Sequence, residues 1–409
     1  KPGYILKKRK IGMQLALKNK PSIFLLLILL IILVTSLSNP IIFLFSDGFS
    51  LHLSSFIVYL GFSLSLLKYV SNSAMFHNAA LLLFIPLFFI TLILSLYFTF
   101  EDFNYRKFNG LLSYLYFFIF VFIISFEKIS YEKAQSFFRI ALIITVASMY
   151  VIEVATIAEL RSNNNKSGLF YVFPFQFLYF YFFSKNNLLD KVFLLFSILA
   201  TVYAFSFDFQ KSAFIYMFTT LFLTFWISYK TFKPSRKILL LSLAGIFVLF
   251  GYEFVWQIFS SEIFDRDYSF INSQDVNALD SSLYRFYVYQ YAFNALTSDI
   301  FHFLFGYGPG YFSTVHDGAT PHSSALYFLI SFGFFGFFSY YFLIFLSLRR
   351  IFRALTFEKY SRFNGFLIVF ILSGLIYSLF NNANGLAWEE ATFSTNILFF
   401  TAILLPFRL

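Results

Sequence analysis

The sequence predicts an all-α integral membrane protein with about twelve transmembrane helices. Of its 409 residues, 59% are hydrophobic and only 12% are charged, whereas a soluble domain carries about 25% charged residues. The apolar residues occur in long runs, and about 20 consecutive apolar residues let a helix cross a bilayer. The Lys and Arg residues lie in the short segments between these runs, mostly in alternate segments.

The predicted spans divide the chain into three parts. Residues 1–258 carry the first nine spans, residues 259–321 form one large loop, and residues 322–409 carry the last three spans. No A-x-A-like cleavage site follows the first apolar run, so we interpret it as an uncleaved span. The run Ile41–Phe45 is too short to cross, and we expect residues 38–52 to be partly re-entrant. The spans are expected at residues 21–38, 52–67, 78–100, 109–126, 138–158, 168–184, 190–206, 211–229, 238–258, 322–348, 363–381 and 391–407.

The basic residues predict the orientation of the chain. If both termini are cytoplasmic, 23 of the 30 Lys and Arg residues fall on the cytoplasmic side, where short loops are enriched in these residues. Odd-numbered spans then run outward and even-numbered spans return. The cations left on the outer side need another explanation; they are Arg106, Lys107, Arg161, Lys166, Lys211, Arg266 and Arg285.

Composition argues against several classes of function. The formal net charge is +10, but the cations cluster in loops where they meet anionic lipid, so we expect no nucleic-acid partner. The absence of Cys excludes disulfides, thiolate chemistry and Cys-ligated metals. Deep ionisable residues are scarce, and Glu153 and Glu253 both lie near outer ends of spans. An ion-coupled transporter usually carries such residues near the midplane of the bilayer.

The large loop, residues 259–321, is predicted to lie on the outer face. It is mostly acidic, with Arg266 and Arg285 as its basic residues. Apolar and aromatic residues recur at helical spacing from Leu283 to Leu296, which predicts one or two amphipathic helices. The sequence Gly306-Tyr-Gly-Pro-Gly310 then breaks the helix.

A group of basic residues and one His occupies the outer ends of spans and this loop. Arg and Lys suit phosphate, since Arg offers a planar fork and Lys a compact charge. A lipid-linked pyrophosphate would lie at this depth, and His titrates near neutral pH, so it could accept a proton from a sugar hydroxyl. The candidate residues are Arg161, Lys166, Lys211 with the adjacent Ser212, Arg285 and His322.

Each of these residues also has a plainer interpretation. A cation at the membrane surface more often snorkels or forms an ion pair than binds a ligand. A His at a helix start after Pro is more often a cap or a solvated residue. The pair Gly333 and Gly336 is most simply a small-residue helix contact, and Gly306 and Gly308 are most simply turn residues.

The last third of the chain contains three motifs: Asp280-Ser-Ser-Leu-Tyr-Arg285, Phe305-Gly-Tyr-Gly-Pro-Gly310 and the stretch from Pro321 to Gly336. Together they resemble the signature of the bacterial O-antigen ligase and polymerase superfamily. Earlier in the chain, Asp208 to Ser212 and Arg161 to Pro174 are similar to two further family segments. The family's usual His-Asn is His322-Ser323 here, and its usual Ser-Arg is Lys211-Ser212.

The resemblance implies a GT-C-like membrane glycosyltransferase of the bacterial inner membrane with a periplasmic active site. Its donor would be a glycan on undecaprenyl pyrophosphate, and transfer would be inverting and metal-independent, with no cofactor. Arg161, Lys211 and Arg285, with Lys166 and Ser212 beside them, would bind the pyrophosphate. His322 would sit beside the acceptor hydroxyl, and Arg285 would act with it in catalysis.

Within this superfamily, the sequence favours a polymerase of O-antigen or related polysaccharide repeat units in lipopolysaccharide biosynthesis. Both donor and acceptor would then be undecaprenyl-pyrophosphate-linked, and a chain-length regulator is a further candidate partner. The alternative is a ligase that transfers the glycan to lipid A–core. A transporter or flippase of lipid-linked sugars is a third interpretation from a different class. No acidic pair stands in the first outer loop, where Asp47 is alone, so we predict no metal.

Overall fold

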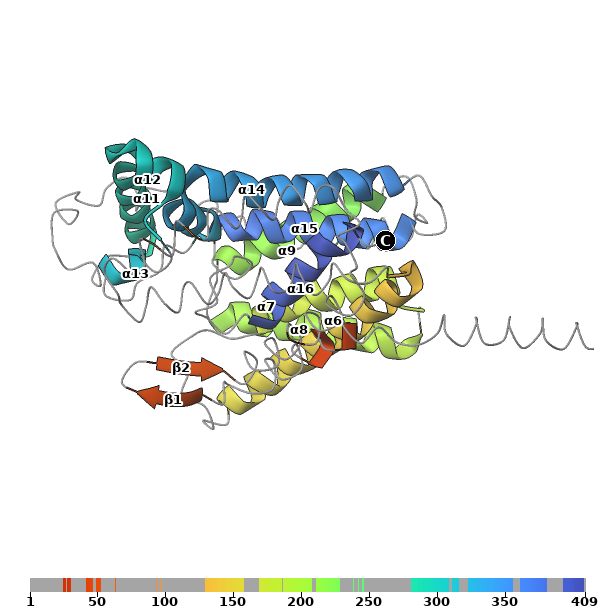
Figure 1. Ribbon diagram of the computed structural model, residues 1–409. Helices are drawn as coiled ribbons and strands as arrows, with labels where there is room; N and C mark the ends of the chain where they lie inside the picture. Colours follow the sequence, from red (N-terminus) through yellow and green to blue (C-terminus); the bar gives the residue numbers. More distant parts are fainter. Residues whose placement is uncertain are drawn as a thin grey trace, which may run out of the picture.

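The computed structural model describes most of the chain after residue 128 and a few short pieces elsewhere. In the described part, the protein is a bundle of helices with one two-stranded hairpin (Figure 1). The described residues are 25–26, 28–30, 42–46, 49–52, 63, 93, 97, 129–157, 169–185, 187–207, 211–228, 238, 242, 245, 281–308, 311–315, 323–355, 361–380 and 393–407.

Seven of the predicted spans coincide with helices that the structure describes. The first four of these are α6 (Tyr131–Ile157), α7 (Leu169–Leu178) with the π-helical turn η1 (Tyr179–Phe183), α8 (Leu188–Phe207) and α9 (Lys211–Ser228). The last three are α14 (Ser324–Ala354), α15 (Ser361–Phe380) and α16 (Phe393–Leu404) with the 3-10 turn η6 (Leu405–Phe407). Helix α6 begins seven residues before the predicted span because Glu132 and Lys133 extend the helix beyond its apolar part.

Three of these helices are long and apolar enough to cross a membrane: Tyr131–Val151, Ser324–Ala354 and Ser361–Leu379. The apolar helical stretches Tyr171–Phe183 and Ala213–Ser228 are shorter. These helices indicate a membrane-embedded protein. The total of twelve spans and the GT-C-like arrangement remain predictions, because several expected spans fall largely or wholly outside the described residues.

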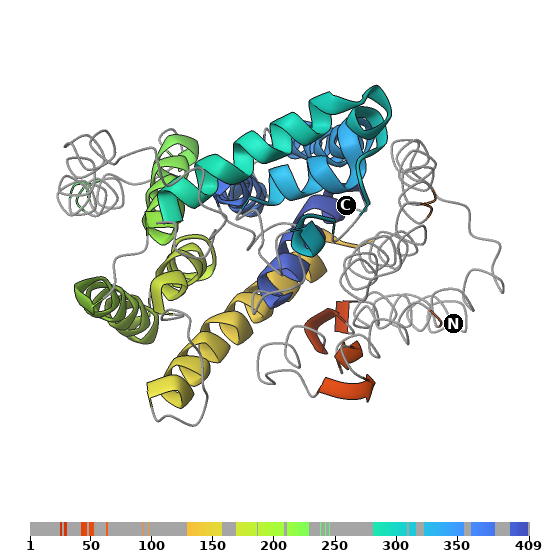
Figure 2. The ribbon, with the colours of Figure 1, turned by 90° about the vertical axis from the view of Figure 1, so that its left-hand side faces the viewer.

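Helix α15 lies in the middle of the described bundle, packed against α9 and α14 (Figures 1 and 2). Its side chains from Phe366 to Ile371 are almost completely buried. Rings from α6 and from η1 surround it: Phe138 and Phe183 lie 5.4 and 4.9 Å from Phe366, centroid to centroid. The core around α15 is therefore rich in aromatic rings, which pack among aliphatic side chains.

The described part of the chain is helical, as expected, apart from one short hairpin. Strands β1 (Ile42–Ser46) and β2 (Phe49–His52) pair antiparallel, with Ile42 opposite His52 and Ser46 opposite Phe49. This hairpin occupies the segment that we expected to be re-entrant. A sequence signal was present, because Asp-Gly at 47–48 between two apolar runs is typical of a two-residue hairpin turn.

The loop predicted at 259–321 contains helices, as expected: α11 (Ser281–Ser298), α12 (Ile300–Phe305) and α13 (Tyr311–Val315). Together with the start of α14 they form one end of the described molecule, at the left of Figure 1, which we call the α11 end. The described part of α11 buries Ala292 and Leu296, yet Phe293 is 68% exposed. The helix therefore has an apolar side chain on its exposed face as well as on its buried face.

Candidate functional site

The structure describes three of the predicted site residues, and only by their backbone. Lys211 and Ser212 are the first two residues of α9, and Arg285 is the fifth residue of α11. Arg161, Lys166 and His322 lie outside the described residues. The spatial relation of Lys211 and Arg285 therefore follows from the positions of α9 and α11.

The start of α9 and the start of α7 meet the last turn of α15. The ring of Tyr377 on α15 lies 4.9 Å from that of Tyr216 on α9 and 5.9 Å from that of Tyr171 on α7. Tyr216 follows Lys211 by five residues, which is about 8 Å of helix. The backbone of Lys211 therefore lies little more than one turn from the Tyr216–Tyr377 contact.

Helix α11 contacts the same end of α15. The hydroxyl of Tyr289 donates a hydrogen bond to the carbonyl oxygen of Leu379, 3.3 Å away. Arg285 precedes Tyr289 by one turn, about 6 Å of helix. Figure 2, which views the α11 end, shows α11 extending across the bundle from α14 toward α9. The backbones of Lys211 and Arg285 are thus gathered around the last turn of α15.

Helix α11 also packs against the start of α14. Ala292 and Leu296 form a small core with Phe312 of α13 and Ile330 of α14. Helix α14 begins after Ser323, whose hydroxyl accepts a hydrogen bond from the Leu326 N–H at 3.3 Å and caps the helix. The N-cap of α14, which was one plain interpretation of His322, is therefore Ser323.

Two glycines with positive φ lie in close contact where the turn after α12 packs against α14. At Gly333 the backbone leaves the helical region (φ 60°, ψ −166°), so α14 consists of two helical segments on either side of this break. Gly306 has φ 79° and lies against it. A Cβ on Gly333 would be 2.5 Å from the Gly306 nitrogen, and a Cβ on Gly306 would be 2.5 Å from the Phe332 nitrogen. Gly333 is thus a close-contact position, as expected, but its partner is a turn.

The break in α14 is closed by backbone hydrogen bonds from that turn. The N–H of Tyr307 donates to the Ile330 carbonyl at 2.8 Å, and the N–H of Gly308 donates to the Ser331 carbonyl at 3.0 Å. In an unbroken helix these carbonyls would accept from residues four positions later. The turn therefore replaces the helical bonds that the break removes and fixes the loop to the start of α14.

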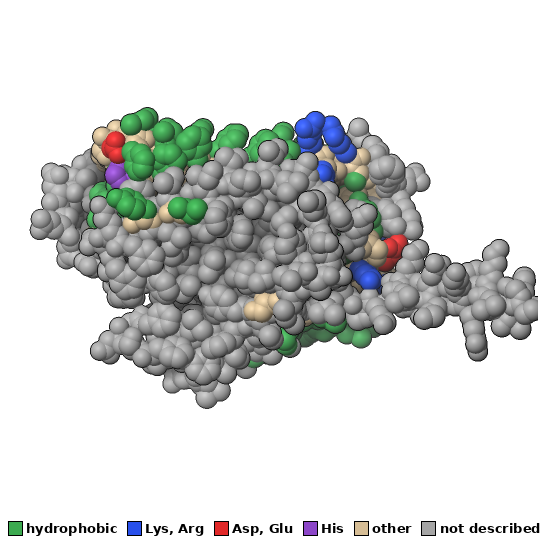
Figure 3. All heavy atoms as spheres, in the orientation of Figure 1, with side chains coloured by type: hydrophobic (Ala, Val, Ile, Leu, Met, Phe, Trp, Pro, Cys, Tyr) green, Lys and Arg blue, Asp and Glu red, His purple; other side chains and the backbone are tan. Residues whose placement is uncertain are grey.

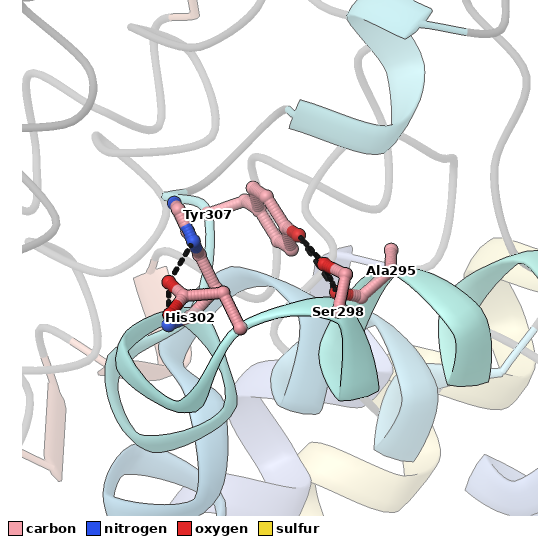
Figure 4. Close-up of polar contacts among 5 residues, drawn as sticks. Ala295, Ser298, His302 and Tyr307 are labelled. Carbon is pink, nitrogen blue, oxygen red and sulfur yellow. Dashed lines mark hydrogen bonds and ion pairs between the residues drawn. The ribbon is translucent and has the colours of Figure 1, made fainter.

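A polar and aromatic cluster supports this turn (Figure 4). The Asp299 carboxylate lies 2.8 Å from Nδ1 of His302, whose ring stacks on Tyr307 at 4.1 Å. The Tyr307 ring stacks in turn on Tyr311 at 4.3 Å. The hydroxyl of Tyr307 donates to the Ala295 carbonyl at 2.7 Å. This cluster was not anticipated, although Asp before an apolar run is a recognised N-cap signal.

Two pKa shifts accompany the cluster. The N–H of Phe301 donates to the Asp299 carboxylate and, with further contributions from His302, lowers the pKa of Asp299. Partial burial, and secondarily the neighbouring Tyr291 hydroxyl, raises the pKa of Tyr311. Asp299 is therefore a stable anion and Tyr311 a neutral hydroxyl over the ordinary pH range.

The opposite end of the bundle is basic. The blue side chains in Figure 3 lie there, away from the red and purple of the α11 end. A surface hollow of about 510 Å³ at this end is lined by Phe345, Leu348, Arg349, Phe352 and Arg353. We call this the basic end. Its described basic residues are Lys133, Arg139, Lys185, Lys191, Arg349, Arg350, Arg353 and Arg362.

Two helices, α9 and α14, begin at the α11 end. The first N–H groups of a helix together with its dipole attract negative charge. Among the described residues, no group of three His, Asp or Glu side chains could hold a metal ion; metal independence remains a prediction.

No known family model matches this chain, and comparison with curated proteins finds no similar sequence.

Proposed function

We propose that this protein is a membrane glycosyltransferase that polymerises polysaccharide repeat units carried on undecaprenyl pyrophosphate. The reaction would take place at the α11 end, which would face the periplasm, while the basic end would face the cytoplasm. The residues that would carry the reaction are Arg161, Lys211, Arg285 and His322, with Lys166 and Ser212 beside them.

One observation carries the proposal. Lys211 and Arg285 stand on helices that both contact the last turn of α15, and α11 also packs on the start of α14, which follows His322 in the sequence. These segments are far apart along the chain. The resemblance to the O-antigen polymerase and ligase superfamily independently selects the same residues. The alternation of spans alone would bring these positions to one end of the bundle, so the choice of a transferase rests on the residue types found there and on the resemblance.

The proposed chemistry needs no group beyond these side chains and the two substrates. The acceptor hydroxyl attacks the anomeric carbon of the donor, opposite to the pyrophosphate, and gives its proton to His322. The bond between the anomeric carbon and the pyrophosphate oxygen breaks, and undecaprenyl pyrophosphate leaves. Arg285, Lys211 and Arg161 stabilise the negative charge that develops on it. The positive ends of α9 and α14 add to the same effect.

The charge distribution supports the orientation in the proposal. The described basic side chains at the basic end lie on α6, α8, α14 and α15 and in the segment before α8. Cytoplasmic loops of inner-membrane proteins are enriched in Lys and Arg. The α11 end, whose described outer cations are Lys211 and Arg285, would then be where a lipid-linked pyrophosphate is presented after translocation.

Polymerisation by the purified protein tests the proposal. The full chain in detergent would be given synthetic lipid-pyrophosphate repeat units in the presence of EDTA, and products would be separated on a gel. We expect a ladder of glycans that disappears in Arg285→Ala and in His322→Ala. Binding of the lipid-pyrophosphate, measured in parallel, would weaken in Arg285→Ala and persist in His322→Ala.

Other outcomes would select the alternatives. Transfer only after lipid A–core is added would identify a ligase and overturn the polymerase assignment. No transfer to either acceptor by monodisperse protein would overturn the enzyme assignment. Movement of lipid-linked sugar across liposomes that contain the protein would then identify a transporter.

A further inference from the structure

A continuous row of exposed phenyl rings runs from the loop onto α14. Phe303 of α12 stacks on Phe334 at 6.0 Å, Phe334 on Phe338 at 6.0 Å, Phe338 on Phe342 at 5.6 Å, and Phe342 on Phe345 at 6.4 Å. Each of the five rings is exposed, from 37% at Phe303 to 57% at Phe345. We call this row the phenyl ladder. It joins α12 to α14 on one surface.

The position of the phenyl ladder on α14 indicates which medium covers these rings. On α14 the rings recur every three or four residues, so they occupy one face of a helix that is long and apolar enough to span a membrane. A soluble surface rarely exposes so large an apolar patch. Figure 3 shows hydrophobic side chains along α12 and α14, ending at the Lys and Arg side chains of the basic end. This face of α14 is therefore the face in contact with lipid.

The length of the helix sets the depth of its two ends. From Gly333 to Arg353 the helix rises about 30 Å, which equals the thickness of the hydrocarbon core of a bilayer. With Arg353 at one boundary, the break at Gly333 lies at the other. The first segment of α14, residues 324–332, then lies beyond the hydrocarbon core.

Helix α12 packs on this break and continues the apolar surface. Ile300 is 70% exposed and Phe301 is 43% exposed, while Phe305 contacts Phe335 on the far side of the break, with ring centroids 5.6 Å apart. Its polar residues, Asp299 and His302, bond to one another. Helix α12 therefore carries exposed apolar side chains at the depth where the hydrocarbon core ends.

We propose that α12 lies in the outer boundary of the bilayer, with Ile300, Phe301 and Phe303 in contact with lipid, and that α14 crosses the membrane only with residues 334–354. The tenth span is then shifted from the predicted 322–348, and the loop is fastened to the membrane surface. This holds α11 just outside the hydrocarbon core. The proposal depends on α14 crossing the membrane and is independent of the proposed transferase activity.

Site-directed spin labelling tests this placement directly, because the natural chain contains no Cys. The single variants Ile300→Cys, Phe342→Cys and Asn294→Cys would be labelled with a nitroxide and reconstituted in liposomes. Asn294 is exposed on α11 beside Phe293 and serves as the aqueous control. Collision rates with oxygen, which concentrates in the hydrocarbon core, and with a water-soluble nickel chelate give the depth of each label.

We expect Phe342→Cys to be deepest, Ile300→Cys to lie at a shallow depth inside the bilayer, and Asn294→Cys to be aqueous. Phe301→Cys provides a second position on α12 and should match Ile300→Cys. Nickel accessibility at both α12 positions equal to that of Asn294 would overturn the proposal. Protection of both positions from both reagents would also overturn it, since a protein surface and not lipid would then cover α12. Circular dichroism of the Ile300→Cys and Phe301→Cys proteins would show that each is folded.

Discussion

In the interior of the bundle, Phe366 packs edge-on against Phe138, Phe182 and Phe183, with ring centroids 4.9–5.9 Å apart. At the α11 end, ring contacts such as Phe303–Phe334 also join α12 to α14, but this contact depends in addition on two glycines and two backbone hydrogen bonds. The interior is thus held by many similar ring contacts, whereas the α11 end also needs a few contacts of fixed geometry.

The two regions differ in how closely their contacts fix the positions of the residues. A phenyl core tolerates changes of side chain as long as its volume is kept, because apolar contacts are not directional. The α11 end must hold Arg285 and the start of α14 in a defined relation, and positive-φ glycines and backbone bonds do this with little freedom. Substitutions of comparable size should therefore affect the two regions very differently.

The largest effect on stability is expected from Gly333→Ala. An Ala at φ 60° is strained, at a cost of roughly 1–3 kcal/mol for the backbone alone, and its Cβ would lie 2.5 Å from backbone atoms of Leu304, Phe305 and Gly306. We expect a clear fall in the midpoint of thermal unfolding, measured by circular dichroism in detergent.

Gly245→Ala is the matched control, because nothing lies within 4 Å of a Cβ at that position. It should leave the midpoint unchanged or raise it slightly, since Ala favours a helix over Gly by up to about 1 kcal/mol. If Gly333→Ala behaved like this control, the break in α14 would not be a fixed feature of the fold.

A smaller effect is expected from Phe366→Leu in the core. Phe366→Leu leaves a small cavity but keeps an apolar side chain, so it should cost about 1–2 kcal/mol, below the roughly 3–5 kcal/mol of Phe→Ala in a core. The several rings around Phe366 can adjust. The same unfolding measurement should show a modest fall in the midpoint. A loss as large as that of Gly333→Ala would contradict the distinction between the two regions.

Tyr307→Phe should cost about 1 kcal/mol, the usual net value of one hydrogen bond. It removes the donation to the Ala295 carbonyl but keeps the ring between His302 and Tyr311. Tyr307→Ala, which also removes the ring, should lower the unfolding midpoint further. Equal midpoints for the two variants would mean that the stack contributes nothing.

The smallest effect concerns Asp299, which is exposed. Its pKa is lower in the folded protein than in the unfolded chain, chiefly because the Phe301 N–H donates to it. The stabilisation is therefore present above the unfolded pKa and is lost as the pH falls through the folded pKa. We expect Asp299→Asn to unfold at a midpoint that changes less than that of the natural protein between about pH 5 and pH 3. An unchanged pH dependence would show that another carboxyl group is responsible.

The apolar runs predicted the helices well, because burial of an apolar side chain in lipid or in a phenyl core needs only the right residue type. Helices α8, α9 and α15 begin and end within two residues of the predicted spans. Helix α14 follows this rule only in part. Its break at Gly333 depends on a contact with Gly306, which lies 27 residues earlier in the sequence. A local sequence pattern cannot predict a contact between residues so far apart.

The candidate site could be predicted as a set of residue types but not as an arrangement. The count of basic residues singled out Lys211 and Arg285, and the structure brings the helices that bear them to one end. The Asp299–His302 pair was missed because His302 becomes part of a cluster only when the turn brings Tyr307 and Tyr311 onto its ring. The cap at Ser323 was likewise missed, because only the neighbouring His322 was considered as a cap.

Polymerisation by two arginine variants from opposite ends of the molecule tests the central claim most directly. Arg285→Ala changes the α11 end, and Arg349→Ala changes the exposed surface of the basic end. If the α11 end is the site of transfer, Arg285→Ala should lower the rate of ladder formation by about 100-fold or more, the usual loss when one stabilising donor is removed. Arg349→Ala should stay within about twofold of the natural protein, while both variants keep its unfolding midpoint. Equal losses in the two variants, or a loss in Arg349→Ala alone, would contradict the account.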